Sequence, residues 1–154
     1  MTRRIALLLA FLLAPAIALA QTNPQDFEEA RKVFRQFVLL EQSYNPEIIE
    51  FYADSAEIYT TVILQGREQE FRTTGKDFKA ALAPYLHTAR NIGEWFAYTN
   101  VTIVPEGSGM RVLASRTSRL SDETFPYQAL LQRSPRGNWV IVEERSVVRP
   151  VNPE

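Results

Sequence analysis

Residues 95–148 decide the fold: WFAYTNVTIVPEGSGMRVLASRTSRLSDETFPYQALLQRSPRGNWVIVEERSVV. Long runs rich in Val, Ile, Thr, Phe and Tyr are typical of β-strands. The polar or glycine-containing segments between them are too short to hold a crossover helix, so they indicate hairpin turns. The predicted elements are four strands joined as an antiparallel meander, over residues 95–104, 110–120, 125–132 and 139–148.

Helical patterns precede the meander. Apolar residues recur on one face of the segment Asp26–Gln42, as expected of an amphipathic helix. Asn45-Pro46-Glu47 is typical of the start of a short helix, with Asn as the N-cap and Pro in the first helical position. A third helix is predicted over Gly75–Ala89, and Pro84 is expected to kink or interrupt it. Between the second and third helices we predict two strands, 57–64 and 67–72.

This order of elements indicates an α+β fold. Three N-terminal helices should pack on a strongly curved, mainly antiparallel sheet, because each element has one apolar face to bury. A chain of 154 residues is expected to form a single domain. We assign residues 21–148 to this domain and residues 149–154 to a C-terminal tail.

The first twenty residues have the pattern of a secretory signal peptide. Arg3 and Arg4 make a short positive region, and an apolar run over residues 5–17 follows. Ala18-Leu19-Ala20 supplies the small residues of a cleavage site, so the cut is expected after Ala20. A membrane anchor is the alternative, but a span needs about 20 apolar residues. We therefore predict a periplasmic or secreted protein with no membrane segment once the signal is removed.

Composition excludes several kinds of chemistry. The chain has no cysteine and one histidine, which removes thiol catalysis, cysteine-ligated metals and disulfides. Carboxylates would be the only remaining metal ligands, so we expect no metal site, and nothing in the sequence indicates a cofactor. The net charge is −1, whereas a nucleic-acid-binding domain presents a basic face. We therefore expect no nucleic-acid partner.

Two stretches carry a resemblance to a known family. Residues 45–58, NPEIIEFYADSAEI, resemble the second helix and first strand of the nuclear transport factor 2-like superfamily, which has the SnoaL-like and ketosteroid-isomerase-like cone fold. Residues 137–146, GNWVIVEERS, are similar to its final strand. The resemblance implies a cone with a pocket between helices and sheet, and a homodimer packed through the sheet. Members include isomerases, dehydratases, cyclases and binding modules.

Glu41 is the first candidate for acid–base chemistry. It projects from the apolar face of the first helix, and a buried carboxylate should either be paired or lie at a wet cavity. The partner would be Arg116 or Arg145, or the side chain would turn into solvent. In a ketosteroid-isomerase-like site, which the resemblance suggests, a pocket carboxylate with a raised pKa is the proton shuttle.

Glu143 is the second candidate. By the period of two, Glu143 and Arg145 share a strand face with Trp139 and Ile141. That face should leave the core toward the pocket mouth or the sheet edge, so the two charged residues would contact a ligand or form a surface or cross-strand pair. His87 should be exposed, because it projects about 180° from the apolar face of its helix.

Aromatic and arginine side chains are the candidates for ligand contacts. Tyrosines bring an apolar ring and a polar hydroxyl to a pocket, and arginine binds carboxylates in a bidentate manner. Ordinary core packing and a solvated sheet face are the alternatives. The residues considered as ligand-binding are Tyr44, Tyr52, Tyr59, Trp95, Arg116, Tyr127 and Arg145.

These observations leave three functions open. The first is an exported module that binds a small apolar or acidic molecule or another protein, and the absence of an evident catalytic constellation favours it. The second is a cofactor-independent isomerase, dehydratase or cyclase that uses a pocket Glu and a Tyr. The third is a structural dimer whose pocket is filled by its own side chains. An open cavity would separate the first two from the third.

Overall fold

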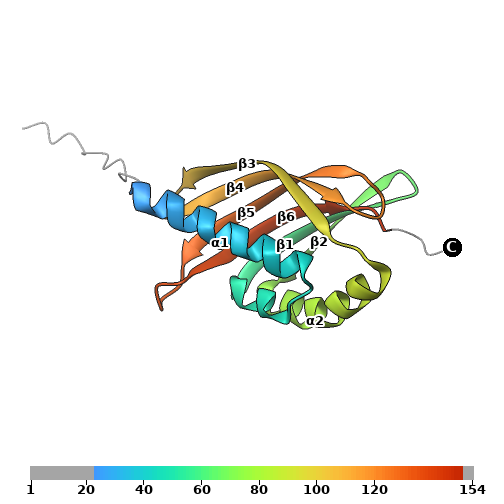
Figure 1. The fold of residues 1–154 in the computed structure, drawn as a ribbon, viewed down its shortest axis with the longest axis horizontal. Helices are drawn as coiled ribbons and strands as arrows, with labels where there is room; N and C mark the ends of the chain where they lie inside the picture. The colour runs from blue at the N-terminus through green and yellow to red at the C-terminus, as the bar shows by residue number, and fades with distance from the viewer. Residues whose placement is uncertain (1–22, 151–154) are drawn as a thin grey trace, which may run out of the picture.

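A computed structural model describes residues 23–150, and the expected signal peptide and the last four residues of the tail lie outside this range. Figure 1 shows two helices on one side of a single curved sheet. The elements are α1 (Pro24–Gln42), the short 3₁₀ helix η1 (Pro46–Phe51), β1 (Tyr52–Leu64), β2 (Arg67–Thr74), α2 (Gly75–Ile92), β3 (Phe96–Glu106), β4 (Gly109–Ser118), β5 (Thr124–Arg133) and β6 (Trp139–Val148).

The sheet has six strands in the order β2-β1-β6-β5-β4-β3. Every neighbouring pair is antiparallel except β1 and β6, which are parallel. The four-strand meander is confirmed as β3 to β6. The predicted fold class, α+β with helices on a curved and mainly antiparallel sheet, is also confirmed.

Helix α1 begins at Pro24, one residue after the first described residue. The Asn23 side chain accepts a hydrogen bond from the backbone N–H of Gln25, which satisfies one of the free donors at the helix start. Ala30, Phe34 and Phe37 are the buried residues of this helix, as the apolar stripe of the sequence predicts. They form one wall of the core and hold α1 across the sheet (Figure 1).

The second helix is shorter than the sequence indicates. It is a 3₁₀ helix that ends at Phe51, and β1 begins at Tyr52 rather than at residue 57. The side chain of Asn45 caps it by accepting from the N–H of Glu47. Tyr52 therefore belongs to the sheet and not to a helix face. Its ring is 4 % exposed and points into the core.

Helix α2 closes one end of the sheet. A Cβ atom at Gly75 would overlap the carbonyl oxygen of Ala53, so glycine allows the helix to start directly against β1. The expected interruption at Pro84 does not occur, and the helix runs on to Ile92. Pro84 is exposed, so water can bind the backbone carbonyl that loses its partner there.

Strand β6 contains a bulge that changes which side chains face inward. Leu131 pairs with Ile141 whereas Leu130 pairs with Glu143, so Val142 is an extra residue on β6. The alternation of faces shifts by one at this point. Glu144 and Ser146 are buried on the inner side with Ile141. The prediction that Glu143 shares a face with Ile141 is therefore wrong.

The core fills only part of the space between helices and sheet. Buried apolar residues gather where α1 crosses β4, β5 and β6. Toward α2 and the open end of β1 and β6 the filling is incomplete, and a cavity remains. No helix within residues 23–150 combines the length and the apolar character needed to cross a membrane.

Candidate functional site

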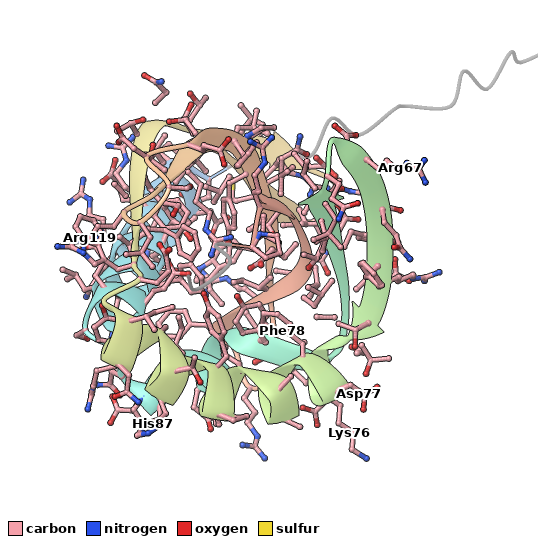
Figure 2. The ribbon with its side chains drawn as sticks, turned by 90° about the vertical axis from the view of Figure 1, so that its right-hand side faces the viewer. Arg67, Lys76, Asp77, Phe78, His87 and Arg119 are labelled. Carbon is pink, nitrogen blue, oxygen red and sulfur yellow. The ribbon has the colours of Figure 1, made fainter. Side chains whose placement is uncertain are left out.

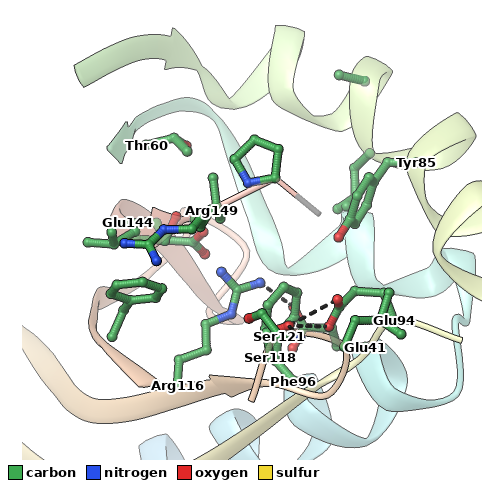
Figure 3. A pocket seen from close by; sticks show the side chains of 18 of the residues that line it. Glu41, Thr60, Tyr85, Glu94, Phe96, Arg116, Ser118, Ser121, Glu144 and Arg149 are labelled. Atoms are coloured by element: carbon green, nitrogen blue, oxygen red, sulfur yellow. Dashed lines mark hydrogen bonds and ion pairs between the residues drawn. The ribbon is translucent and has the colours of Figure 1, made fainter. Parts of the chain in front are cut away.

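The cavity has a volume of about 470 Å³ and lies between α2, η1 and the inner face of the sheet. Its walls combine apolar side chains with a smaller number of buried charged groups (Figure 3). The apolar lining includes Ile48, Phe78, Leu82, Phe96, Leu120, Phe125 and Val148; the buried or half-buried charged groups are Glu41, Glu94, Arg116 and Glu144, and the exposed Arg149 also contributes to the lining.

Glu144 is the most deeply buried carboxylate in this wall, with 4 % of its surface exposed. Its Oε2 atom accepts hydrogen bonds from the hydroxyls of Tyr52, at 2.7 Å, and Tyr127, at 3.0 Å. Burial raises the pKa of Glu144, while the two hydroxyls and Arg116 work against that rise. Burial also raises the pKa of Tyr52 and Tyr127, so both phenols remain donors.

Arg116 forms an ion pair with Glu41 across the cavity floor. Its Nη2 atom donates to Oε1 of Glu41 at 3.1 Å, and the two side chains are 11 % and 15 % exposed. The guanidinium carbon lies 3.5 Å from the centre of the Phe96 ring, which fixes the plane of the arginine by a cation–π contact. The structure thus pairs the carboxylate on the apolar face of α1 with one of the two arginines expected for it.

Polar atoms remain without partners at this pair. Oε2 of Glu41 and Nε of Arg116 are fully buried and make no hydrogen bond within the described part of the chain. The hydroxyl of Tyr98, a residue whose ring packs edge-on against Tyr127, is in the same condition. Unpartnered buried polar atoms are costly, which is why they concentrate at sites where a ligand or water completes them.

A third carboxylate, Glu94, also lines the cavity. Glu94 is 7 % exposed, and both of its oxygens accept from the Ser118 hydroxyl. The backbone N–H of Arg119 donates to the same carboxylate at 3.2 Å. Unlike Glu41, Glu94 has hydrogen-bond donors from the protein on both of its oxygens. It therefore forms part of the wall and does not need a ligand as a donor.

The predicted site residues divide between the cavity and the rest of the molecule. Glu41, Tyr52 and Arg116 line the cavity. Tyr127 lies directly behind it and reaches it through Glu144. Tyr44 lies outside the lining, where the Arg90 guanidinium packs over its ring.

Trp95 does not line the cavity. It precedes β3 and is half-buried, and its carbonyl oxygen accepts from the N–H of Arg119.

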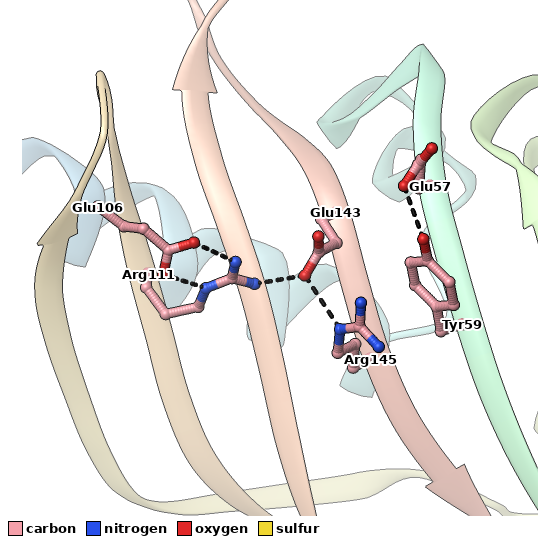
Figure 4. A network of polar contacts seen from close by, with 6 residues as sticks. All are labelled: Glu57, Tyr59, Glu106, Arg111, Glu143 and Arg145. Atoms are coloured by element: carbon pink, nitrogen blue, oxygen red, sulfur yellow. Dashed lines mark hydrogen bonds and ion pairs between the residues drawn. The ribbon is translucent and has the colours of Figure 1, made fainter.

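The remaining candidates, Glu143, Arg145 and Tyr59, lie on the outer face of the sheet (Figure 4). Oε1 of Glu143 accepts from Arg111, at 2.8 Å, and from Arg145, at 3.1 Å. The guanidinium of Arg145 packs 4.0 Å from the centre of the Tyr59 ring. The bulge at Val142 turns Glu143 and Arg145 away from the cavity, and Tyr59 of β1 lies on the same outer face, so none of the three occupies the ligand-facing position considered for it.

His87 is exposed, as predicted. Figure 2 shows it pointing outward from α2, whereas Phe78 on the same helix points into the molecule. Sequence reasoning missed Glu144 and Glu94. The pair Glu143-Glu144 was a usable signal, because a one-residue bulge exchanges which of two adjacent side chains faces inward.

No group of three or more potential metal ligands occurs among residues 23–150. The chemistry available in the cavity is hydrogen bonding and proton transfer by carboxylates and phenols, in an apolar enclosure that strengthens both.

Comparisons with solved structures identify the fold. No protein-family model matches the chain, and no curated protein matches it significantly. An NTF2-like protein of unknown function from Pseudomonas putida aligns over 77 % of this chain and 82 % of its own, with a TM-score of 0.59 and 14 % identity. The chain has an NTF2-like fold.

Two further structures agree with this fold. An NTF2-like protein with a cystatin-like fold from Novosphingobium aromaticivorans covers 80 % of this chain and 82 % of its own, at TM-score 0.53 and 19 % identity. A candidate dehydratase of the NTF2-like family from Streptomyces avermitilis covers 84 % and 98 %, at TM-score 0.54 and 14 % identity. At such identities the similarity establishes the fold alone, and function must come from the site.

Proposed function

We propose that this protein is exported and binds a small, mostly apolar molecule inside the NTF2-like cone. The observation that carries the proposal is the cavity of about 470 Å³, whose lining combines apolar side chains with Arg116 and Glu144, each of which has a polar atom that no described residue bonds. Its volume lies within the range of about 300–1,000 Å³ that ligand pockets occupy. The mixture of an apolar wall and a few convergent polar groups is also typical of such pockets.

The same observation argues against a cone filled by its own side chains. A filled cone would leave no room for a ligand, and its buried polar atoms would pair with each other. Here the described side chains leave both space and unsatisfied hydrogen-bonding capacity at the cavity floor. A structural role is therefore the weaker of the two functions.

Native mass spectrometry of the protein purified from the periplasm tests the proposal. We expect a mass increment from a co-purified small molecule that disappears on denaturation. Ala81 lines the cavity from α2 and Ala80 does not, although both are exposed. Ala81→Trp should fill the cavity and abolish the increment, whereas Ala80→Trp should retain it. A bound molecule that persists in Ala81→Trp would contradict binding in this cavity.

Export is tested separately by the position of the N-terminus. Cleavage after Ala20 predicts a periplasmic form that begins at Gln21. N-terminal sequencing of the periplasmic fraction checks this directly. Recovery of uncleaved chain from the cytoplasm alone would remove export from the proposal without affecting the cavity.

An enzyme of the isomerase, dehydratase or cyclase kind is the second candidate. The observation that favours it is Glu144, a buried carboxylate with a raised pKa held by two tyrosine hydroxyls. Such a group can take a proton from a carbon next to a carbonyl and return it elsewhere on the same molecule, because a raised pKa makes the carboxylate a stronger base. Fold neighbours at low identity include a candidate dehydratase, which is compatible with this chemistry.

Deuterium exchange separates the two candidates. The molecule released from the protein would be incubated with fresh protein in D₂O and followed by NMR. An enzyme would introduce deuterium at a carbon position, and Glu144→Gln would stop the exchange while still binding the molecule. No exchange in the wild-type protein would leave the binding function and remove the enzymatic one.

A further inference from the structure

The charged groups at the floor of the cavity form a row of alternating sign. Arg116 lies between Glu41 and Glu144, and Figure 3 shows its guanidinium pointing into the open space with Glu41 on one side and Glu144 on the other. It is within ion-pair distance of Glu41. No ion pair links it to Glu144 within residues 23–150, so part of the row is open to a ligand.

Both donors and acceptors in this row lack partners. Within the described residues, the only hydrogen bond of the Arg116 side chain is the one from Nη2 to Glu41, so Nη1 has no partner. Nε of Arg116 and Oε2 of Glu41 are also unbonded, but protein atoms enclose them and a ligand does not reach them. Glu144 uses only Oε2 toward the two tyrosines, and none of the described residues donates to its Oε1. A ligand must therefore accept from the arginine and donate to a carboxylate.

From this row we infer that the ligand is a neutral molecule whose polar head both donates and accepts hydrogen bonds, as a primary carboxamide or an alcohol does. A carboxylate head would gain Arg116 but would lie beside Glu41 and Glu144, and the other arginine of the lining, Arg149, is already paired with Glu123. An ammonium head would gain the carboxylates but would lie beside a guanidinium that never loses its charge. Like charges at close range in a dry site are strongly unfavourable. A neutral head satisfies both signs without either penalty.

The apolar wall indicates what the head is attached to. Phe78 and Leu82 of α2 face Phe96 and Phe125 of the sheet across the cavity. Aromatic rings favour an aromatic or flat apolar body by stacking and edge contacts. The expected ligand class is therefore an uncharged aromatic amide or alcohol. This inference rests on the proposed function, because it assigns the ligand chemistry of the same cavity.

Three probes that differ only in the head group test the inference. They are 3-phenylpropanamide, 3-phenylpropanoate and 3-phenylpropylammonium, titrated into the purified protein at pH 7 by isothermal calorimetry. We expect the amide to bind at least tenfold more tightly than either ion. Equal or tighter binding of the carboxylate or the ammonium would overturn the inference, and so would the failure of all three to bind at millimolar concentration. The native mass measurement decides the proposed function independently of these outcomes.

Charge-removing variants provide the internal control. Glu41→Gln can still accept from Arg116 but removes one negative charge. The affinity for 3-phenylpropanoate should therefore rise at least fivefold relative to the affinity for 3-phenylpropanamide. Arg116→Gln should raise the relative affinity of the ammonium by a similar factor. Arg145→Gln, on the outer face, should change none of the three affinities. If Arg116→Gln does not fold, Glu41→Gln alone decides, and an unchanged carboxylate-to-amide ratio there would overturn the inference.

Discussion

Arginine and glutamate side chains occur on both faces of the sheet, but the two faces differ in how completely these side chains are hydrogen-bonded. On the outer face Arg111 donates to Glu106 and Glu143, and each of its three guanidinium nitrogens has a carboxylate partner (Figure 4). On the inner face Arg116, from the same strand, makes one hydrogen bond and leaves buried atoms free. The two arginines are equally well enclosed, but only the incompletely bonded one lies beside the cavity, which is why the proposed function rests on the inner face.

The largest expected effect comes from breaking the outer network. Arg111→Met would leave Glu106 and Glu143 without their shared cation, and the Arg111 side chain is only 10 % exposed. We expect the free energy of unfolding to fall by about 2–3 kcal/mol, as for loss of a partner in a largely buried charged network. Urea denaturation measures this. Binding in the cavity should not change, and a stability loss below about 0.5 kcal/mol would contradict a structural role.

A matched pair of tyrosines sharpens the comparison. Tyr52 and Tyr59 each donate to a glutamate at 2.7 Å, the first to Glu144 inside and the second to Glu57 outside. Tyr52→Phe should lower the free energy of unfolding by about 1–2 kcal/mol, because a buried acceptor loses a donor. Tyr59→Phe should cost less than about 0.5 kcal/mol, because water replaces the hydroxyl. Similar costs in the two variants would remove the distinction between the faces.

The pH dependence of stability should have opposite signs on the two faces. Burial raises the pKa of Glu144 above 4.5, so the folded state holds that proton more tightly and loses stability as the pH rises from about 5. Glu144→Gln should therefore gain stability relative to wild type as the pH rises above about 5. The effect should be smaller than that of Tyr52→Phe, because the tyrosines and Arg116 oppose the rise.

Glu106 provides the opposite case. The hydrogen bonds that it accepts from Arg111 lower the pKa of Glu106 below 4.5. Its contribution to the free energy of unfolding is therefore present at neutral pH and is lost as the pH falls below about 5. Glu106→Gln should cost more stability at pH 6 than at pH 3. Urea denaturation of both variants across this range checks the two signs together, and a shared sign would refute the assignment.

The smallest effect is expected at His87. Its ring is exposed on α2, and its contact is with Asn91 one turn later. His87→Gln should change the free energy of unfolding by less than about 0.5 kcal/mol. It should also leave the amide affinity unchanged, and a clear loss of binding would place the histidine in the site against the geometry.

Much of the fold followed from local patterns in the sequence. The helix over residues 24–42 and the strand over 139–148 have strong apolar periods, so their bounds agree closely with prediction. Local patterns fail where a neighbouring element decides the outcome. Pro84 is tolerated in α2 because it faces solvent, and Tyr52 is drawn into the sheet by pairing with Ile141.

The candidate site was predicted in part, and the error on β6 has one physical origin. Glu41 and Arg116 were recognised because a charge on an apolar stripe demands a partner. Glu143 was selected instead of Glu144 because strict alternation was assumed along β6. The register shift at Val142 depends on the partner strand β5, and no pattern within β6 alone reveals it.

The parallel pairing of β1 with β6 also governs when the molecule can form. Tyr52 and Ile141 are partners although most of the chain separates them, so closing this contact is an expensive, late step in folding. Until residues 139–148 have been synthesised, β1 and β2 cannot join the other strands, because β6 is the strand that connects them to the sheet. The export proposed above would benefit from such a delay, because the chain stays open until its last strand arrives.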